Sequence, residues 1–316
     1  MRAPPPEAPV ARFISARLLV TVPVVFGVTL AVFSMLFLIP GDPVKIMLSE
    51  FGTNPEQIAR MRAQLHLNEP LAEQFGRFVW GVVQGNLGES IRDRRPVRAE
   101  ILEVLPATVQ LAVTALVLSG LLGITLGILA AVRQNSWWDM GSMVVALIGV
   151  SMPSFWLGLL LILLFSLYLG WLPATGGGGL EHLVLPACAL GAGAAAIIAR
   201  LTRSTMLEVL RMEYMTTARA KGLTGAGVVL GHGLKNALIP IITIFGLQFG
   251  SLLAGTVIIE TVFGRPGIGR LLVGAILYKD FPLVQGVVLF VAVGYVLINL
   301  AVDVIYAAID PRIRYG

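Results

Sequence analysis

Residues 107–132 read ATVQLAVTALVLSGLLGITLGILAAV, a run without a single charged side chain. A helix needs about 20 such residues to cross the hydrocarbon core of a bilayer. Further uncharged runs cover 18–39, 140–173, 183–199, 236–259 and 281–302. One run of this kind fits the core of a soluble protein, but six in one chain do not. The sequence therefore predicts an all-α integral membrane protein with six transmembrane helices.

Composition supports this fold class, because 56% of the 316 residues are hydrophobic and only 13% are charged. A soluble domain carries about 25% charged residues. The first run is too long for the apolar part of a signal peptide, and no A-x-A-like cleavage site follows it, so we interpret it as a membrane anchor. The single cysteine, Cys188, cannot form an internal disulfide and indicates nothing about redox compartment.

The distribution of charge predicts the topology. If both termini are cytoplasmic, the inside segments carry 12 Lys and Arg against six Asp and Glu, whereas the outside segments are nearly balanced. An excess of positive charge marks cytoplasmic loops. The net charge of +5 is thus explained by topology, and we expect membrane lipid and no nucleic acid as a partner.

The chain divides into four predicted parts. Residues 1–17 form a cytoplasmic tail, 18–39 the first transmembrane helix, 40–106 an extracytoplasmic loop with amphipathic helices, and 107–316 a core of five transmembrane helices. The loop is expected to hold two helices, one capped by Thr53 and Glu56 with Pro55 in its first turn, and one with apolar residues from Leu71 to Val82. These helices are either a docking platform for an external protein or interfacial helices without a partner.

Small residues recur every four positions in the fourth and fifth runs, and such ladders let helix backbones approach closely in lipid. We expect these faces to meet protein, within the chain or at the interface with a second subunit. The candidate packing residues are Ala187, Gly191, Ala195, Gly246, Gly250 and Ala254. Two prolines, Pro153 and Pro240, are expected to bend their helices because each removes a backbone donor.

The segment 203–235 between the fourth and fifth runs is the most informative cytoplasmic stretch. A helical pattern extends from about 205 to 221, and Gly222 is expected to end it by adopting a positive φ. Thr224 and the next two glycines are expected to form a turn before a second helix. A short amphipathic helix held off the membrane suits a groove in a soluble partner. The alternative is a connector without a partner.

Several strings in the chain carry a specific resemblance. They are PGDP at 40–43, QGNLGES at 84–90, SMPSFWLG at 151–158, TARAKGL at 217–223, HGLKNALIP at 232–240, PGIGRLLVGAIL at 266–277 and DFPLVQG at 280–286. Together they make residues 12–316 similar to the B-type permease subunit of dipeptide and oligopeptide (peptide/nickel) ABC importers. This family is the binding-protein-dependent class of importer.

The general loop pattern of such permeases, E-A-A-x-x-x-G followed by nine residues and I-x-L-P, is only partly present. Ala218, Gly222 and Leu234 match it, whereas Thr216, Thr217, His232 and Lys235 depart from it. These departures fit the narrower peptide subfamily. The resemblance implies a type I ABC importer permease fold in which 203–235 is the coupling loop. The implied ATPase-coupling residues are Glu213, Tyr214, Thr217, Ala218, Arg219, Ala220, Lys221, Gly222 and Leu223.

The resemblance also implies a heterodimer with a second homologous permease subunit, two ATPase subunits that bind ATP and Mg, and an external substrate-binding protein. None of the four lysines follows a glycine, so the chain has no Gly-Lys-Ser/Thr phosphate loop of its own. We therefore expect no catalytic residue, no cofactor and no metal in this chain, and a place in the bacterial cytoplasmic (inner) membrane.

The substrate class is implied to be di- or oligopeptides, with nickel, glutathione or oligosaccharides as alternatives for the same machinery. The other class of function is a self-sufficient secondary transporter. That alternative predicts inverted repeats with broken helices at matching positions. The chain shows no convincing internal repeat, and the long segment 203–235 would be unexplained.

Overall fold

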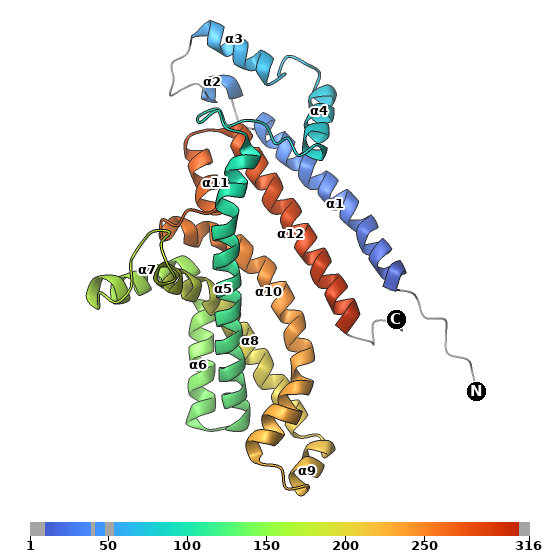
Figure 1. The fold of residues 1–316 in the computed structure, drawn as a ribbon, viewed down its shortest axis with the longest axis vertical. Coiled ribbons are helices and arrows are strands. Elements are labelled where there is room, and N and C mark those ends of the chain that lie inside the picture. Colours follow the sequence, from blue (N-terminus) through green and yellow to red (C-terminus); the bar gives the residue numbers. More distant parts are fainter. Residues whose placement is uncertain (1–9, 39–41, 48–53, 310–316) are drawn as a thin grey trace, which may run out of the picture. The chain divides into compact units, whose positions relative to one another are not determined.

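The computed structural model describes residues 10–38, 42–47 and 54–309, and the regular elements within these ranges are helices (Figure 1). The chain divides into two compact units, residues 1–106 with 267–301 and 314–316, and residues 107–266 with 302–313. The α-helices and two π-helical segments are α1 Val10–Leu38, α2 Pro43–Met47, α3 Pro55–Gln64, α4 Leu71–Val83, α5 Val97–Val132, α6 Trp137–Ser151, α7 Ser154–Leu161, η1 Ile162–Tyr168, α8 Glu181–Leu210, α9 Glu213–Ala220, η2 Gly227–Leu234, α10 Lys235–Val262, α11 Ile268–Leu277 and α12 Phe281–Ile309.

Five of the described helices, α1, α5, α8, α10 and α12, are long and apolar enough to cross a membrane. A sixth span results if α6 and the α7–η1 pair are counted together, although these two pieces are bent by 109°. The third apolar run is therefore not one straight helix. Met152 adopts an extended ψ of 129° at the break, because the ring of Pro153 disfavours the helical conformation of the residue before it. Pro153 also lacks the N–H that would continue the helix. Pro240, in contrast, lies inside α10, which continues through it.

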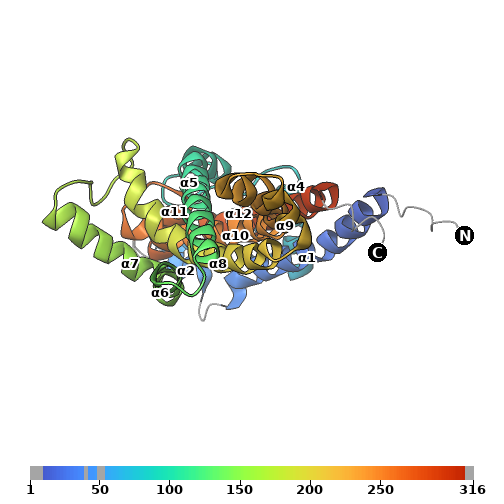
Figure 2. The ribbon, with the colours of Figure 1, turned by 90° about the horizontal axis from the view of Figure 1, so that it is seen from below.

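The second unit is built around α8. The apolar window of α8 is 67% buried, against 39% for α5 and 22% for α10. It packs against α6, α7 and α10, and Figures 1 and 2 show α5 and α6 running beside it. Six alanines and Gly191 are among its 15 buried residues. The small side chains let the neighbouring backbones approach, as expected for helix packing in lipid.

In the first unit, the segment between α1 and α5 contains the two helices that the sequence predicts. We call this segment the outer loop, after its predicted extracytoplasmic location. The cap of α3 differs from the prediction, because Asn54 accepts a hydrogen bond from the Glu56 backbone N–H at 3.0 Å, whereas Thr53 lies outside the described residues. Pro55 does occupy the first helical position. The loop is also shorter than predicted, since α5 already begins at Val97.

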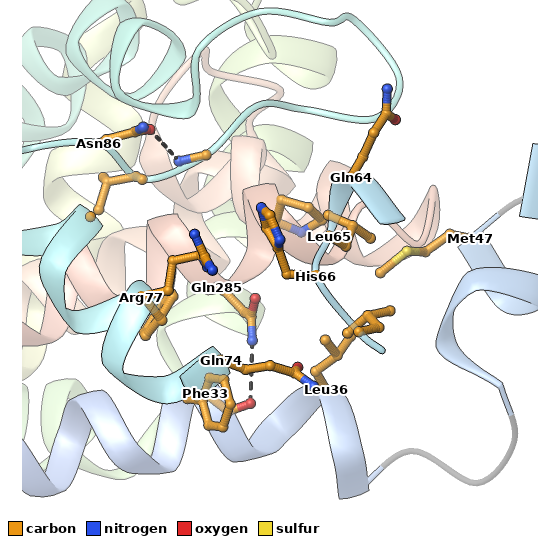
Figure 3. Close-up of a pocket in the computed structure, with 16 residues that line it drawn as sticks. Phe33, Leu36, Met47, Gln64, Leu65, His66, Gln74, Arg77, Asn86 and Gln285 are labelled. Carbon is orange, nitrogen blue, oxygen red and sulfur yellow. Dashed lines mark hydrogen bonds between the residues drawn. The ribbon is translucent and has the colours of Figure 1, made fainter. Parts of the chain in front are cut away.

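A pocket of about 250 Å³ lies in this unit beside α1 and α4 (Figure 3). Its apolar lining includes Phe33 and Leu36 of α1, and polar side chains such as Arg77 and His66 also line it. Gln285 of α12 reaches toward α1 and donates a hydrogen bond to the Val32 carbonyl oxygen at 3.1 Å. The pocket is therefore formed by the packing of the outer loop on α1 and the start of α12.

Asp280 joins the outer loop to the start of α12 and is only 3% exposed. Its Oδ2 accepts hydrogen bonds from the Ser90 hydroxyl at 2.6 Å and from the Ile91 N–H at 3.0 Å. Its Oδ1 accepts the Leu283 N–H at 3.2 Å and so caps α12. One buried carboxylate thus fixes two segments that are far apart in sequence.

Candidate functional site

The helix predicted from 205 to 221 is interrupted, and the predicted continuity is wrong. α8 ends at Leu210, Met212 adopts an extended ψ of 147°, and α9 begins at Glu213. The Met215 N–H donates to the Met212 carbonyl at 3.0 Å and starts the new helix. Only two residues, Arg211 and Met212, therefore separate α9 from α8.

The end of α9 is the one predicted from the sequence. Gly222 has a φ of +80°, and its N–H donates to the Arg219 carbonyl oxygen at 3.0 Å. No atom lies within 4 Å of the position that a Cβ would take. The requirement for glycine is thus set by the backbone conformation, which costs other residues about 1 kcal/mol or more.

The buried side of α9 packs into the core of the second unit. Met215 is fully buried and Ala218 is 7% exposed. Both belong to one apolar cluster with Met206 and Val209 of α8 and Val228 of η2. Ala218 was expected to touch a partner, but its side chain faces this internal cluster. Its small size is therefore explained by packing within the chain.

The other candidate coupling residues are exposed. They are Glu213, Tyr214, Thr217, Arg219, Ala220, Lys221, Gly222 and Leu223. The Tyr214 hydroxyl accepts a hydrogen bond from Asn236 Nδ2 at 2.9 Å, and the same nitrogen donates to the His232 carbonyl at 3.0 Å. This contact ties the exposed side of α9 to the first turn of α10.

The predicted turn at Thr224 is instead the beginning of a helix. The Thr224 hydroxyl accepts from the Gly227 N–H at 3.2 Å, and its carbonyl accepts from the Val228 N–H at 2.9 Å. The chain then continues through η2 into α10. Figure 1 shows α9 at the end of the second unit, beside the first turns of α10.

The exposed surface around α9 is basic. Charged residues exposed between 200 and 235 are Arg200, Arg211, Arg219, Lys221 and Lys235 against Glu208 and Glu213. Charge complementarity of this kind favours a partner with an acidic surface and accelerates encounter. The arrangement can bind a macromolecule, and it holds no set of side chains arranged for acid–base or nucleophilic catalysis.

The two small-residue ladders lie mostly at helix contacts within the chain. A Cβ at Gly191 would lie 2.8 Å from the Ala115 carbonyl oxygen of α5, and Ala187 and Ala195 are buried beside it. In the second ladder, Gly246 approaches the Val302 side chain and Gly250 is buried, whereas Ala254 is exposed. A role of these six residues in packing against a second subunit stays a prediction.

Three polar contacts in the second unit were missed by the sequence analysis. Arg203 binds Asp139, buried Glu260 accepts from the Thr108 hydroxyl at 2.6 Å, and Arg265 donates to Gln110 Oε1 at 2.8 Å. Burial lowers the pKa of Arg265, although the nearby Glu260 carboxylate opposes that change. The only signal in the sequence is that Asp139 and Glu260 directly border apolar runs.

Family comparisons agree with this architecture. A family model described as the binding-protein-dependent transport system inner membrane component matches residues 123–315. A second model, for the N-terminal part of such membrane components, matches residues 10–112. Together they cover most of the chain.

Curated relatives are similar along nearly the whole length. A di/tripeptide transport system permease protein of Pseudomonas aeruginosa is 45% identical and is matched over 96% of this chain and 98% of its own length. A glutathione transport system permease protein of Escherichia coli is 45% identical, with 96% and 99% covered. A dipeptide transport system permease protein of Alkalihalophilus pseudofirmus is 44% identical, with 95% and 98% covered.

Among solved structures, an inward-facing methionine ABC transporter, MetNI, matches with a TM-score of 0.56 and 20% identity. The match covers 66% of this chain and 96% of that one. Identity at this level shows a shared fold alone, which is the permease fold of type I ABC importers. The chain therefore belongs to the family of inner-membrane permease components of binding-protein-dependent transport systems.

Proposed function

We propose that this chain is a pore-forming permease subunit of an ATP-driven importer that moves di- or oligopeptides across the bacterial cytoplasmic membrane. The observation that carries the proposal is α9: its apolar side is anchored in the core by Met215 and Ala218, while its other side is exposed in a segment, 200–235, whose exposed Lys and Arg outnumber its Glu. A short helix held in this way can receive force from a docked protein and pass it to the helices beneath.

The partner on α9 is proposed to be an ATPase subunit. The chain has no Gly-Lys-Ser/Thr sequence, so an ATP-driven transporter must take its phosphate-binding loop from another chain. The proposed complex contains this permease, a second homologous permease, two ATPase subunits that bind ATP and Mg, and an external binding protein. Both termini and α9 are proposed to be cytoplasmic, which agrees with the excess of Lys and Arg in those segments.

Peptides are the proposed substrate class because similar permeases in two organisms, 45% and 44% identical, are named for di/tripeptide and dipeptide transport. Glutathione is the second candidate, since a glutathione permease is equally similar at 45% identity. Glutathione is itself a tripeptide, so the two candidates differ in the detail of the ligand and not in the transport machinery.

Purification and uptake together test the proposal. The tagged chain, expressed together with the other proposed subunits, should co-purify with an ATPase. Vesicles containing the complex should take up a labelled dipeptide only when ATP is present on the side of the membrane that carries the ATPase subunits. Competition by unlabelled glutathione separates the two substrate candidates. Uptake by the purified chain alone, driven by an ion gradient, would show a secondary transporter instead.

A further inference from the structure

The ion pair between Asp139 and Arg203 joins the start of α6 to α8. Arg203 Nε donates to Asp139 Oδ1 at 2.6 Å, and Nη2 donates to Oδ2 at 2.7 Å. The Asn135 N–H also donates to Oδ2 at 3.0 Å. A bidentate guanidinium–carboxylate contact fixes the relative orientation of the two side chains as well as the distance between them. The pair therefore holds the turn between α5 and α6 at one position along α8.

The side chains of this pair are largely shielded from solvent. The side chains of Asp139 and Arg203 are 7% and 28% exposed. The Arg95–Glu103 pair, between a residue just before α5 and a residue of its second turn, has the same 2.6 Å separation, but its side chains are 52% and 62% exposed. Exposed pairs are screened by water and contribute little, whereas loss of one partner of a shielded pair leaves an uncompensated charge.

The position of the pair along α8 is informative. Arg203 lies about two turns before the end of α8 at Leu210, and α9 begins directly afterwards at Glu213. Between them, Met206 and Val209 form the surface on which the buried side of α9 packs. Any displacement of α9 thus reaches α8 next to the ion pair.

Three glycines of α5 and α6 also lie against the backbone of α8. A Cβ at three glycines would lie 2.7, 2.6 and 3.0 Å from a carbonyl oxygen of α8. These glycines are Gly123 and Gly127 of α5 and Gly149 of α6, which face Ala195, Ala199 and Ala192 respectively. These contacts hold the backbones of α5 and α6 close to α8 along this length, but they contain no charged or hydrogen-bonded side-chain pair. The ion pair closes this attachment at the end nearest α9.

We infer that Asp139 and Arg203 are positioning residues for coupling: they lock α5 and α6 to α8, so that displacement of α9 moves the three helices as one body. The inference rests on the proposed function, in which an ATPase subunit displaces α9. Without the pair, α9 still docks and still moves, but part of its movement is lost at the junction between α6 and α8.

The test measures substrate uptake per ATP hydrolysed in proteoliposomes that contain the complete transporter and its binding protein. Asp139→Asn and Arg203→Gln should each keep the ATPase bound and hydrolysing ATP, while uptake per ATP falls about fivefold or more. Arg203→Lys keeps the charge but loses the bidentate contact. Its uptake per ATP hydrolysed should therefore lie between that of Arg203→Gln and that of the unaltered protein. A purely stabilising pair would change the amount of complex and not this ratio.

Two controls separate the possible failures. Arg95→Gln removes the matched exposed pair and should leave uptake per ATP unchanged. If a single variant does not assemble, the double variant Asp139→Asn/Arg203→Gln is used, because it leaves no unpaired charge. Uptake per ATP hydrolysed in the double variant equal to that of the unaltered protein would overturn the inference. Absence of any ATPase on the unaltered chain would instead contradict the proposed function.

Discussion

Two amphipathic helices lie beside the long apolar helices, α4 in the first unit and α9 in the second, and they are held in different ways. The 13-residue α4 buries only Gln74 fully and rests on α1 through aromatic contacts such as Phe33–Phe75, with centroids 5.3 Å apart. The eight-residue α9 is shorter but places Met215 and Ala218 inside the core. A helix that exchanges force with the membrane core needs this second kind of attachment, whereas a surface helix does not.

The largest expected effect comes from breaking the attachment of α9. Ala218→Asp places a carboxylate in the apolar cluster and should cost about 3 kcal/mol or more of the free energy of unfolding, because a buried charge has no partner there. Denaturant titration in detergent measures it, and the co-purified ATPase should be lost. Thr217→Asp adds the same charge on the exposed side of α9 and should change the free energy of unfolding by less than about 0.5 kcal/mol. Equal effects of the two substitutions would contradict the burial of Ala218.

The second prediction compares a glycine of α5 with a glycine of α4. A Cβ at Gly127, next to the α8 segment that supports α9, would lie 2.6 Å from the Ala199 carbonyl oxygen, whereas a Cβ at Gly76 of α4 meets nothing within 4 Å. Gly127→Ala should therefore cost about 3 kcal/mol through overpacking against backbone. Gly76→Ala should instead stabilise the helix by up to about 1 kcal/mol. The same detergent unfolding assay checks both, and a neutral Gly127→Ala would disprove the close approach of α5 to α8.

These contrasts show which features of the structure could be predicted from the sequence. The apolar runs, the amphipathic α4 and the stop at Gly222 were predicted because each depends on local composition or on one backbone angle. The break at Met212 was not, because residues 205–221 contain no Gly or Pro and keep a helical pattern. It is decided by packing, since α9 turns back so that Met215 meets Met206.

Pairings between residues that are distant in sequence could not be predicted for the same reason. Asp139 and Arg203 are separated by 64 positions, and Thr108 and Glu260 by 152. Asp139 and Glu260 each border an apolar run in the sequence, but nothing local to either residue identifies its partner. For Ala218, the sequence pattern predicted a small residue at a contact with a partner, whereas the three-dimensional packing places its side chain in the chain's own core.

The third prediction separates α4 from α9 in function. Phe75 of α4 contacts Phe26 at 5.8 Å and Phe33 at 5.3 Å between ring centroids. Phe75→Ala should loosen α4 from α1 at a cost of about 1 kcal/mol per aromatic pair. Limited proteolysis from the outer side should then cut the 54–96 segment faster, while the amount of bound ATPase stays the same. A loss of ATPase from this variant would show that the two helices are not independent.

The smallest expected effect is a pH dependence at the base of the outer loop. Arg62 Nη2 donates to Asp42 Oδ2 at 2.6 Å, and Val44 N–H donates to Oδ1 at 3.2 Å. The hydrogen bond from Arg62 holds the pKa of Asp42 below its usual value of about 4, although burial opposes it. A carboxylate whose pKa is lowered by folding stabilises the folded loop above its unfolded-state pKa, and this contribution is lost as the pH falls through the lower folded-state pKa. Protection of the Val44 amide against hydrogen exchange, after correction for the intrinsic rate, should thus be constant from neutral pH down to about 4 and decrease below it. Asp42→Asn should show weaker protection with no decrease in that window, and an unchanged acid dependence in this variant would assign the titration to another group.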